Sequence, residues 1–168
     1  MSHRLEPLAD AHDLDSFYCG DPGLSDWLKK HGRHATRRGT RTYVLVEHAS
    51  NCVIGYFAVA PFLIEREQTP RRIGRGAPSR IPAILLAKLA LDQRLHGGGL
   101  GAELLVHALT TILRAARAAG GRLVVVDAVD DRAAAFYEAH DLEPLPDNPH
   151  RLVMKLSTAA RALDVPWP

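Results

Sequence analysis

Cysteine, long apolar runs and net charge are all scarce in this 168-residue chain. Its two cysteines, Cys19 and Cys52, lack CxxC spacing, which argues against a zinc knuckle, a redox pair or a secreted disulfide framework and favours a reducing cytoplasm. The longest mostly apolar stretch, residues 81–91, contains Lys88 and is too short to span a membrane. The first ten residues contain no apolar signal segment. We therefore expect a protein that is neither exported nor membrane-spanning.

The overall composition is that of an ordinary globular domain, with 46% hydrophobic and 24% charged residues. A chain of this length buries about 70% of the surface that its unfolded form exposes, so its core needs no disulfides. No internal repeat or linker divides it. We expect a single domain over residues 1–168, with a frayed tail over residues 157–168.

Charge is unevenly distributed, although 21 Lys and Arg residues nearly balance 19 Asp and Glu residues. Two stretches, residues 29–41 and 69–80, contain basic side chains and no acidic ones. Such blocks can attract a polyanion to a nearly neutral chain. Neither stretch contains an aromatic residue for base stacking, so contact with a phosphate backbone is favoured over readout of bases, with a solvated surface as the alternative. The candidate phosphate-binding residues are Lys29, Lys30, Arg33, Arg37, Arg38, Arg71, Arg72 and Arg75.

Local patterns predict an alternation of strands and helices. Strands are expected at residues 4–8, 41–47, 52–61, 81–91, 122–128, 142–144 and 151–156, and helices at 13–34 in two pieces, 100–119 and 131–140. The helix at 100–119 has the strongest support, because leucine, isoleucine and alanine recur along one face. Asp130 is expected to cap the last helix. This order favours an α/β fold around one mixed sheet.

The sharpest motif lies between the apolar strand and the long helix, where four of the five residues 97–101 are glycine. Glycines at a strand-to-helix turn let successive N–H groups approach an anion without obstruction by Cβ, and the helix N-terminus adds partial positive charge. The motif therefore predicts a phosphate or pyrophosphate site. A merely flexible turn is the alternative.

The same glycines also satisfy a dinucleotide-binding fingerprint, Gly97-x-Gly99-x-x-Ala102, and Asp127 ends the next strand where a ribose-binding acid would stand. Five residues separate the strand from the first glycine, however, whereas a dinucleotide loop follows its strand directly. The 41 residues after Asp127 are also too few to complete a doubly wound sheet. We therefore disfavour a dinucleotide site.

Two motifs resemble those of the GNAT N-acetyltransferase superfamily. Residues 94–99 (RLHGGG) match its Q/R-x-x-G-x-G/A loop, and residues 133–137 (AAAFY) resemble the A-x-x-F-Y of its last helix, with the required strand between them. The resemblance implies a GNAT-like, mostly antiparallel central sheet with splayed central strands and flanking helices. It also implies acetyl-CoA as the acetyl donor.

The resemblance extends to individual residues. Tyr137 matches the tyrosine that serves as general acid for the CoA sulfur, with simple packing in the core as the alternative. Asp141 stands where the superfamily usually has Gly, so the end of this helix is expected to differ. We expect no metal. The residues implied to bind the donor, through the pantetheine arm or the pyrophosphate, are Leu89, Leu91, Arg94, His96, Gly97, Gly98, Gly99 and Gly101.

The strand at residues 81–91 contains no Glu, although many superfamily members place a general base there. An α-amino group titrates near 7.7–8.0 and a lysine amine near 10.4, so an α-amine is appreciably neutral at pH 7 without a strong base. An α-amine acceptor is therefore favoured over lysine.

The N-terminal half narrows the resemblance to the toxin branch of the superfamily. The segments that carry it are residues 17–20 (FYCG), 24–28 (LSDWL), 55–60 (GYFAVA) and 86–92 (LAKLALD). The resemblance implies acetylation of the amino group of aminoacyl-tRNA, arrest of translation and neutralisation by a ribbon-helix-helix antitoxin. The basic stretches would then contact the tRNA backbone. Because the superfamily often forms dimers, a homodimer is a further expectation.

Two other functions remain compatible with the sequence. The same chemistry could act on a small amine or a peptide, with the basic stretches being ordinary surface. A non-catalytic CoA-binding module would keep the glycine motif but have no acetyl transfer to lose.

Overall fold

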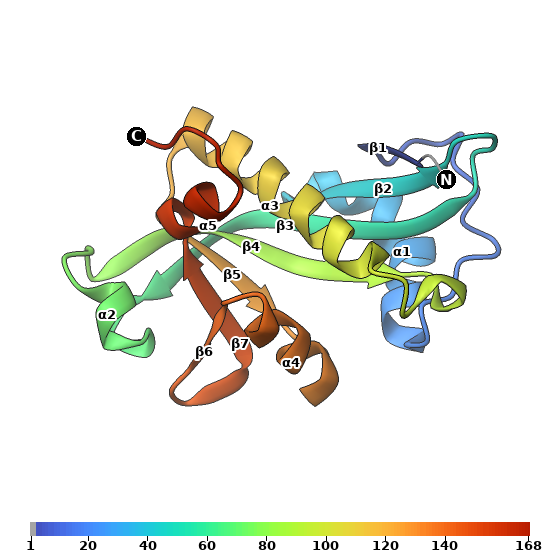
Figure 1. Ribbon diagram of the computed structural model, residues 1–168. Helices are drawn as coiled ribbons and strands as arrows, with labels where there is room; N and C mark the ends of the chain where they lie inside the picture. The colour runs from blue at the N-terminus through green and yellow to red at the C-terminus, as the bar shows by residue number, and fades with distance from the viewer. Residues whose placement is uncertain (1–2) are drawn as a thin grey trace. The chain divides into compact units, whose positions relative to one another are not determined.

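The computed structural model describes residues 3–168, in which helices and strands follow the predicted order closely (Figure 1). The strands are β1 His3–Pro7, β2 Arg41–Glu47, β3 Val53–Glu65, β4 Arg80–Leu91, β5 Leu123–Asp127, β6 Glu143–Leu145 and β7 Asn148–Lys155. The α-helices are α1 Pro22–His31, α2 Arg71–Gly74, α3 Leu100–Ala119, α4 Asp131–Ala139 and α5 Leu156–Ala162. Short 3₁₀ turns are η1 Gly32–Arg38, η2 Arg66–Gln68 and η3 Gln93–Leu95.

The seven strands form a mixed, mostly antiparallel sheet in the order β1-β2-β3-β4-β5-β7-β6. The pairs β1–β2, β2–β3, β5–β7 and β6–β7 are antiparallel, whereas β4 and β5 are parallel. The β4–β5 register runs only from Ala83↔Leu123 to Leu86↔Val126, although β4 continues to Leu91. The fold class predicted from the sequence is confirmed.

The chain forms two compact units, and β3, β4 and α3 contribute residues to both. The first contains the described residues up to Ala60 together with Ala87–Ala108, and the second contains Pro61–Leu86 and Leu109–Pro168. Among the helices of residues 3–168, none combines the length and apolarity needed to cross a bilayer.

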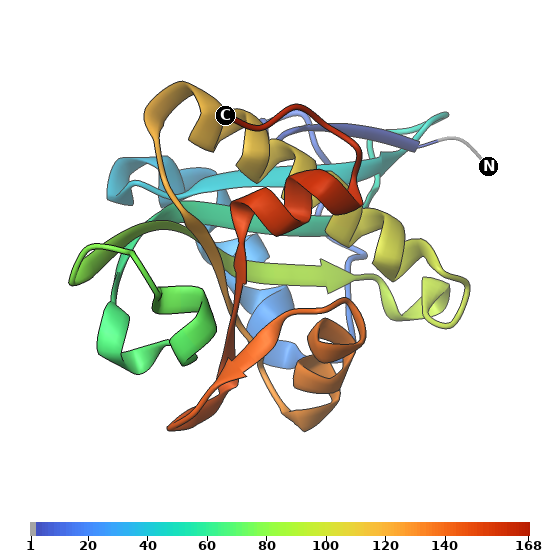
Figure 2. The same cartoon turned by 60° about the vertical axis from the view of Figure 1, so that its left-hand side comes forward.

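In the first unit, α1 packs on one face of the sheet and the start of α3 on the other (Figures 1 and 2). Asp21 begins α1 by accepting a hydrogen bond from the amide of Leu24, 3.0 Å away. On the opposite face Gly55 permits close packing, because a Cβ there would lie 3.3 Å from the Leu104 side chain. The buried residues of the cluster that includes α1 are Leu14, Phe17, Cys19, Leu28, Val44, Val46, Val53, Tyr56 and Ala90.

In the second unit, α4 contacts β6 and β7, and α5 contacts β7 (Figure 2). The buried residues of its core cluster are Ile64, Ile73, Ala77, Ile81, Ala83, Leu123, Val125, Leu145 and Val153. The expected frayed tail is wrong for residues 157–162, which belong to α5. Leu156, Ala159 and Ala160 are buried at the spacing of one helical face, which explains why this segment is helical.

The first half of the helix predicted at residues 13–34 is also wrong. Residues 13–21 form turns and a bridge, with Asp13 paired to Cys52. Gly20, which lies in the expected break between the two predicted pieces, has a φ of +96°, as a turn there permits. The strand predicted at 52–61 instead extends to Glu65.

Candidate active site

Asp92, the residue directly after β4, anchors the turn that leads to the glycines. Its side chain is 2% exposed. One carboxylate oxygen accepts from the Arg94 amide at 3.0 Å and from Arg94 Nε at 2.9 Å, and the other accepts from Arg94 Nη2 at 3.3 Å. Burial raises the pKa of the Asp92 carboxyl, but the hydrogen bonds from Arg94 and the Tyr18 amide outweigh it, so this pKa lies below its ordinary value. The carboxylate therefore holds the start of the loop in place while ionised.

The amides of residues 97–102, which follow this turn, have no hydrogen-bond acceptor within residues 3–168. Those of Leu95 and His96 donate to the carbonyls of Asp92 and Gln93, at 3.0 and 3.2 Å. The next amide with a recorded acceptor within residues 3–168 is that of Glu103, which donates to Gly99 at 3.3 Å. The amides of residues 97–102 thus form a run of free donors at the N-terminus of the 20-residue helix α3.

The glycines are required by backbone conformation. Gly97 and Gly99 have φ values of +86° and +83°, in the left-handed region that favours glycine. A Cβ at either position would meet no other atom within 4 Å. The space above the run of amides is therefore open, as an anion-binding loop requires.

The residues predicted to bind the donor have different surroundings. Arg94 is engaged with Asp92, so its guanidinium supports the loop from within. His96 Nε2 lies 2.8 Å from the Leu91 carbonyl and donates to it, so that carbonyl already has a partner. Leu89 is half-buried and lies beyond the last residue of β4 that pairs with β5. Gly97, Gly98, Gly99 and Gly101 all lie in or next to the run of free amides.

Tyr137 lies in the second unit, on α4. The helix begins where Asp130 accepts a hydrogen bond from the Ala133 amide, 2.8 Å away, which confirms the predicted cap. The tyrosine is 4% exposed, and its ring packs edge-to-face against Phe136, with centroids 5.4 Å apart. Burial, and secondarily the negative charge of Asp127, raise the pKa of the Tyr137 phenol, so it stays protonated at neutral pH.

One ion pair near α4 and the backbone conformation after its last turn characterise this region. Asp127 is held by Arg151, whose Nε and Nη2 donate to the carboxylate at 2.7 and 3.1 Å. Asp141, after the helix, has a φ of +69°. The expectation that replacement of Gly by Asp would alter this end is wrong, because Asp141 adopts the left-handed conformation, which Asp tolerates better than most residues.

The first basic stretch is only partly free. Arg33 donates to the carbonyls of Ala9, Asp10 and His12, so it holds the segment before α1 in place. Lys30 lies 3.9 Å from Asp26 in an exposed i,i+4 pair. The remaining candidates, which are exposed and make no ion pair within residues 3–168, are Lys29, Arg37 and Arg38.

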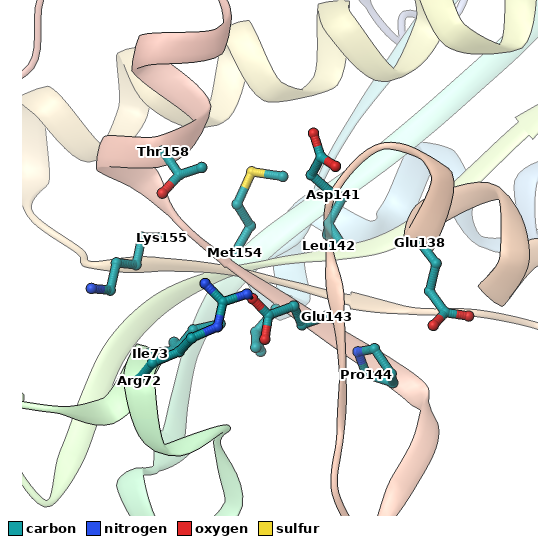
Figure 3. A pocket seen from close by; sticks show the side chains of 11 residues that line it. Arg72, Ile73, Glu138, Asp141, Leu142, Glu143, Pro144, Met154, Lys155 and Thr158 are labelled. Atoms are coloured by element: carbon teal, nitrogen blue, oxygen red, sulfur yellow. The ribbon is translucent and has the colours of Figure 1, made fainter.

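The second basic stretch is also divided. Arg72 forms an ion pair with Glu143, which connects α2 to β6, and Figure 3 shows the two side chains together. They line a cavity of about 610 Å³, on whose wall Lys155 also lies. Arg71 and Arg75 make no ion pair in the described part of the chain. The sequence could not distinguish engaged from free arginines, because their partners come from distant segments.

No model of a known protein family matches the chain. It is 36% identical over 157 residues to the tRNA-acetylating toxin of Mycobacterium tuberculosis (strain ATCC 25618 / H37Rv), covering 93% of each protein. A structure of AtaT complexed with acetyl-methionyl-tRNAfMet is similar at a TM-score of 0.87 and 28% identity, covering 96% of this chain and 99% of that one. A Tyr-to-Phe mutant of AtaT bound to the C-terminus of the antitoxin AtaR and acetyl-CoA is similar at a TM-score of 0.82 and 28% identity, covering 96% and 98%.

A mostly antiparallel sheet, with a glycine turn leading from β4 into a long helix, is the architecture of a GNAT acetyltransferase. Within that class, the 36% identity to a tRNA-acetylating toxin, over 93% of both sequences, establishes the family. The chain belongs to the family of GNAT-fold, tRNA-acetylating toxins of toxin–antitoxin systems.

Proposed function

We propose that this chain uses acetyl-CoA to acetylate the α-amino group of aminoacyl-tRNA and thereby blocks translation. One structural observation carries the proposal: within residues 3–168, the amides of residues 97–102 are unpaired at the N-terminus of α3. Such a row of donors suits the diphosphate of CoA. The family relationship supplies the acceptor, because a relative is named for tRNA acetylation and a neighbour was solved with acetyl-methionyl-tRNA.

The reaction needs few groups from the protein. The neutral amine nitrogen attacks the thioester carbon, the C–S bond breaks, and the amine loses a proton to water. We propose that Tyr137 donates its phenolic proton to the departing CoA thiolate and afterwards regains a proton from water. Because an ordinary phenol, with a pKa near 10, is a weaker acid than an ordinary thiol, near 8.5, this transfer depends on positioning. The AtaT neighbour was studied as a Tyr-to-Phe mutant, a change that removes such a proton.

Leu89 and the glycines keep the donor-binding roles predicted from the sequence, whereas Arg94 and His96 support the loop and the Leu91 carbonyl is already paired. Arg94 acts through Asp92, and His96 acts through the Leu91 carbonyl. The backbone of Leu89 remains the candidate partner for the pantetheine arm. The residues proposed to bind the diphosphate through their amides are Gly97, Gly98, Gly99 and Gly101.

The proposed tRNA contacts follow from the side chains that are free. Lys29, Arg37 and Arg38 in the first unit, and Arg71 and Arg75 in the second, are available to phosphates. Arg33, Arg72 and Lys30 are engaged, so we expect smaller contributions from them.

The remaining proposals concern partners and compartment. We propose that the chain is neutralised by a ribbon-helix-helix antitoxin, that it forms a homodimer, and that it acts in the cytoplasm, where aminoacyl-tRNA is used. Co-purification with the product of a neighbouring reading frame, and light scattering of the purified chain, test the first two. A monomeric mass at micromolar concentration would exclude the dimer.

The activity itself is tested with radiolabelled acetyl-CoA and total aminoacylated tRNA. Label should appear on the amino acid and be released as N-acetyl amino acid when the ester is hydrolysed. Deacylated tRNA, free amino acids and lysine peptides are the matched controls and should remain unlabelled. Label on free amines or peptides would identify the alternative acceptors, and acetyl-CoA binding without transfer to any acceptor would identify a non-catalytic module.

The tRNA contact is tested by reversing charge in the first basic stretch. The double variant Arg37→Glu/Arg38→Glu should raise KM for aminoacyl-tRNA about tenfold at physiological salt and reduce the salt dependence of kcat/KM by a slope of about 1–2. Arg114→Glu/Arg117→Glu, exposed on α3, is the control with the same charge change. Equal losses of activity in the two double variants would argue against a tRNA contact at Arg37 and Arg38.

A further inference from the structure

Lys88 is an unusual residue for its position. It carries the only charge in residues 81–91, and its side chain is half-buried. No carboxylate forms an ion pair with it within residues 3–168. Its Nζ instead lies 5.6 Å from the centroid of the Trp27 ring, at the distance of a cation–π contact. Partial burial of an ammonium without a paired anion costs free energy, which a functional role of Lys88 at this position would explain.

The ring beneath Lys88 is itself held in place. Trp27 stacks on Tyr56, with ring centroids 5.9 Å apart and planes 9° apart. Tyr56 is fully buried, and its hydroxyl donates to the Leu24 carbonyl on α1 at 2.7 Å. The ammonium therefore rests on a fixed aromatic support.

The two faces of β4 differ at this point. Side chains alternate along a strand, so Lys88 shares a face with Ala90, which belongs to the cluster that also contacts Trp27. On the other face Leu91 and Leu104 pack closely around Gly55, where a Cβ would lie 3.3–3.4 Å from both side chains. Residues 87–91 also extend past the β4–β5 register, where we propose that the pantetheine arm binds. Lys88 is half-buried, so its face of this segment carries a partly open, charged side chain, and we expect the acceptor to approach there.

We propose that Lys88 faces the acceptor amine and holds it in its neutral form by electrostatic repulsion of the protonated form. The inference rests on the proposed function, in which an α-amine is the nucleophile. A like charge within a few ångströms disfavours a second ammonium, and this effect replaces a general base on β4. The proton passes to water before attack, and Lys88 itself neither gains nor loses one.

Other ionisable groups near this support do not oppose the effect. From β3, Tyr56 is neutral, because burial raises the pKa of its phenol. Cys19 is a buried free thiol beside Ser25. The carboxylate of Asp21 caps α1, and that of Asp92 is paired with Arg94. On α1, Asp26 is exposed and lies 3.9 Å from Lys30.

The test compares Lys88→Met, which removes the charge, with Lys88→Arg, which keeps it. For each, kcat at saturating aminoacyl-tRNA, whose pH profile reports groups in the enzyme–substrate complex, is measured between pH 5.5 and 9 in reactions quenched within seconds to limit ester hydrolysis. In Lys88→Met the midpoint of the profile should rise by about one pH unit, so that activity at pH 6.5 falls about tenfold and activity at pH 9 approaches that of the wild type. Lys88→Arg should restore the original midpoint. Acetyl-CoA affinity should be unchanged in both variants. Lys155 is a half-buried lysine of the second unit, and Lys155→Met, the control, should leave the pH midpoint unchanged.

Three results would overturn the inference while leaving the proposed function intact: an unshifted midpoint in active Lys88→Met, the same loss at every pH, or failure of Arg to restore the midpoint. If Lys88→Met does not fold, as judged by circular dichroism and urea unfolding, Lys88→Gln gives the same comparison. Absence of transfer by the wild type to any aminoacyl-tRNA would instead refute the proposed function.

Discussion

The glycine turn after β4 and helix α4 after β5 begin in the same way but present different chemistry. Each starts at an aspartate whose carboxylate accepts a backbone amide: Asp92 from Arg94, and Asp130 from Ala133. Asp92 is buried, whereas Asp130 is exposed. The turn then presents a run of amides, and α4 presents one buried side chain, Tyr137. A site made of backbone depends on conformation at every residue, while a site made of one side chain depends on that side chain alone.

The largest expected effect is on turnover, and it distinguishes the role of α4 from that of the glycine turn. Tyr137→Phe should lower kcat by about 10²–10⁴, because it removes the proposed proton donor while keeping the ring that packs on Phe136. The dissociation constant for acetyl-CoA, measured by calorimetry, should be unchanged, since the amides of the turn are untouched.

Phe136→Leu is the matched control, because it alters packing on the same helix but leaves the hydroxyl. It should cost stability more than turnover. If Tyr137→Phe kept more than a tenth of the wild-type kcat, the general-acid role would be wrong.

The sequence predicted both regions well because their signals are local. The helix at Leu100–Ala119 was predicted to the residue, and the glycines and the Asp130 cap were identified by neighbouring letters. The helix α5 also had a local signal, in the spacing of Leu156, Ala159 and Ala160, that the tail prediction overlooked.

Features that depend on distant residues were not predictable in the same way. The Asp13–Cys52 bridge pairs the start of residues 13–21 with a distant segment, which overrides their helical pattern. The burial of Asp92 and its contact with the Tyr18 amide also join segments 74 residues apart in sequence. A polar residue directly after an apolar strand was the only available hint of its role.

A smaller effect tests the backbone half of the comparison. Gly99→Ala should weaken acetyl-CoA binding about tenfold, because φ is +83° there and an L-residue in that region costs about 1–2 kcal/mol. A Cβ would meet no other atom within 4 Å, so the change should act on the conformation of the amides rather than through a clash. Gly98→Ala, at a glycine without positive φ, is the control and should bind nearly as the wild type does. Equal losses at both positions would indicate that bulk, and not backbone conformation, determines binding.

The smallest effect compares the two aspartates. The pKa of Asp92 is lowered in the folded chain, so its carboxylate adds stability that is present above the unfolded pKa, near 3.9, and is lost as pH falls through the folded value. Asp92→Asn should lower the free energy of unfolding by about 1–2 kcal/mol at pH 7, and by less at pH 3, where the wild type has lost part of the same contribution. Asp130→Asn should change it little at either pH, because Asn caps a helix as well as Asp does and the site is exposed. Urea unfolding of the three proteins between pH 3 and 7 measures both differences. A pH-independent gap for Asp92→Asn would mean that the contacts of Asp92 do not depend on its charge, and the turn would then resemble α4 in needing only a cap.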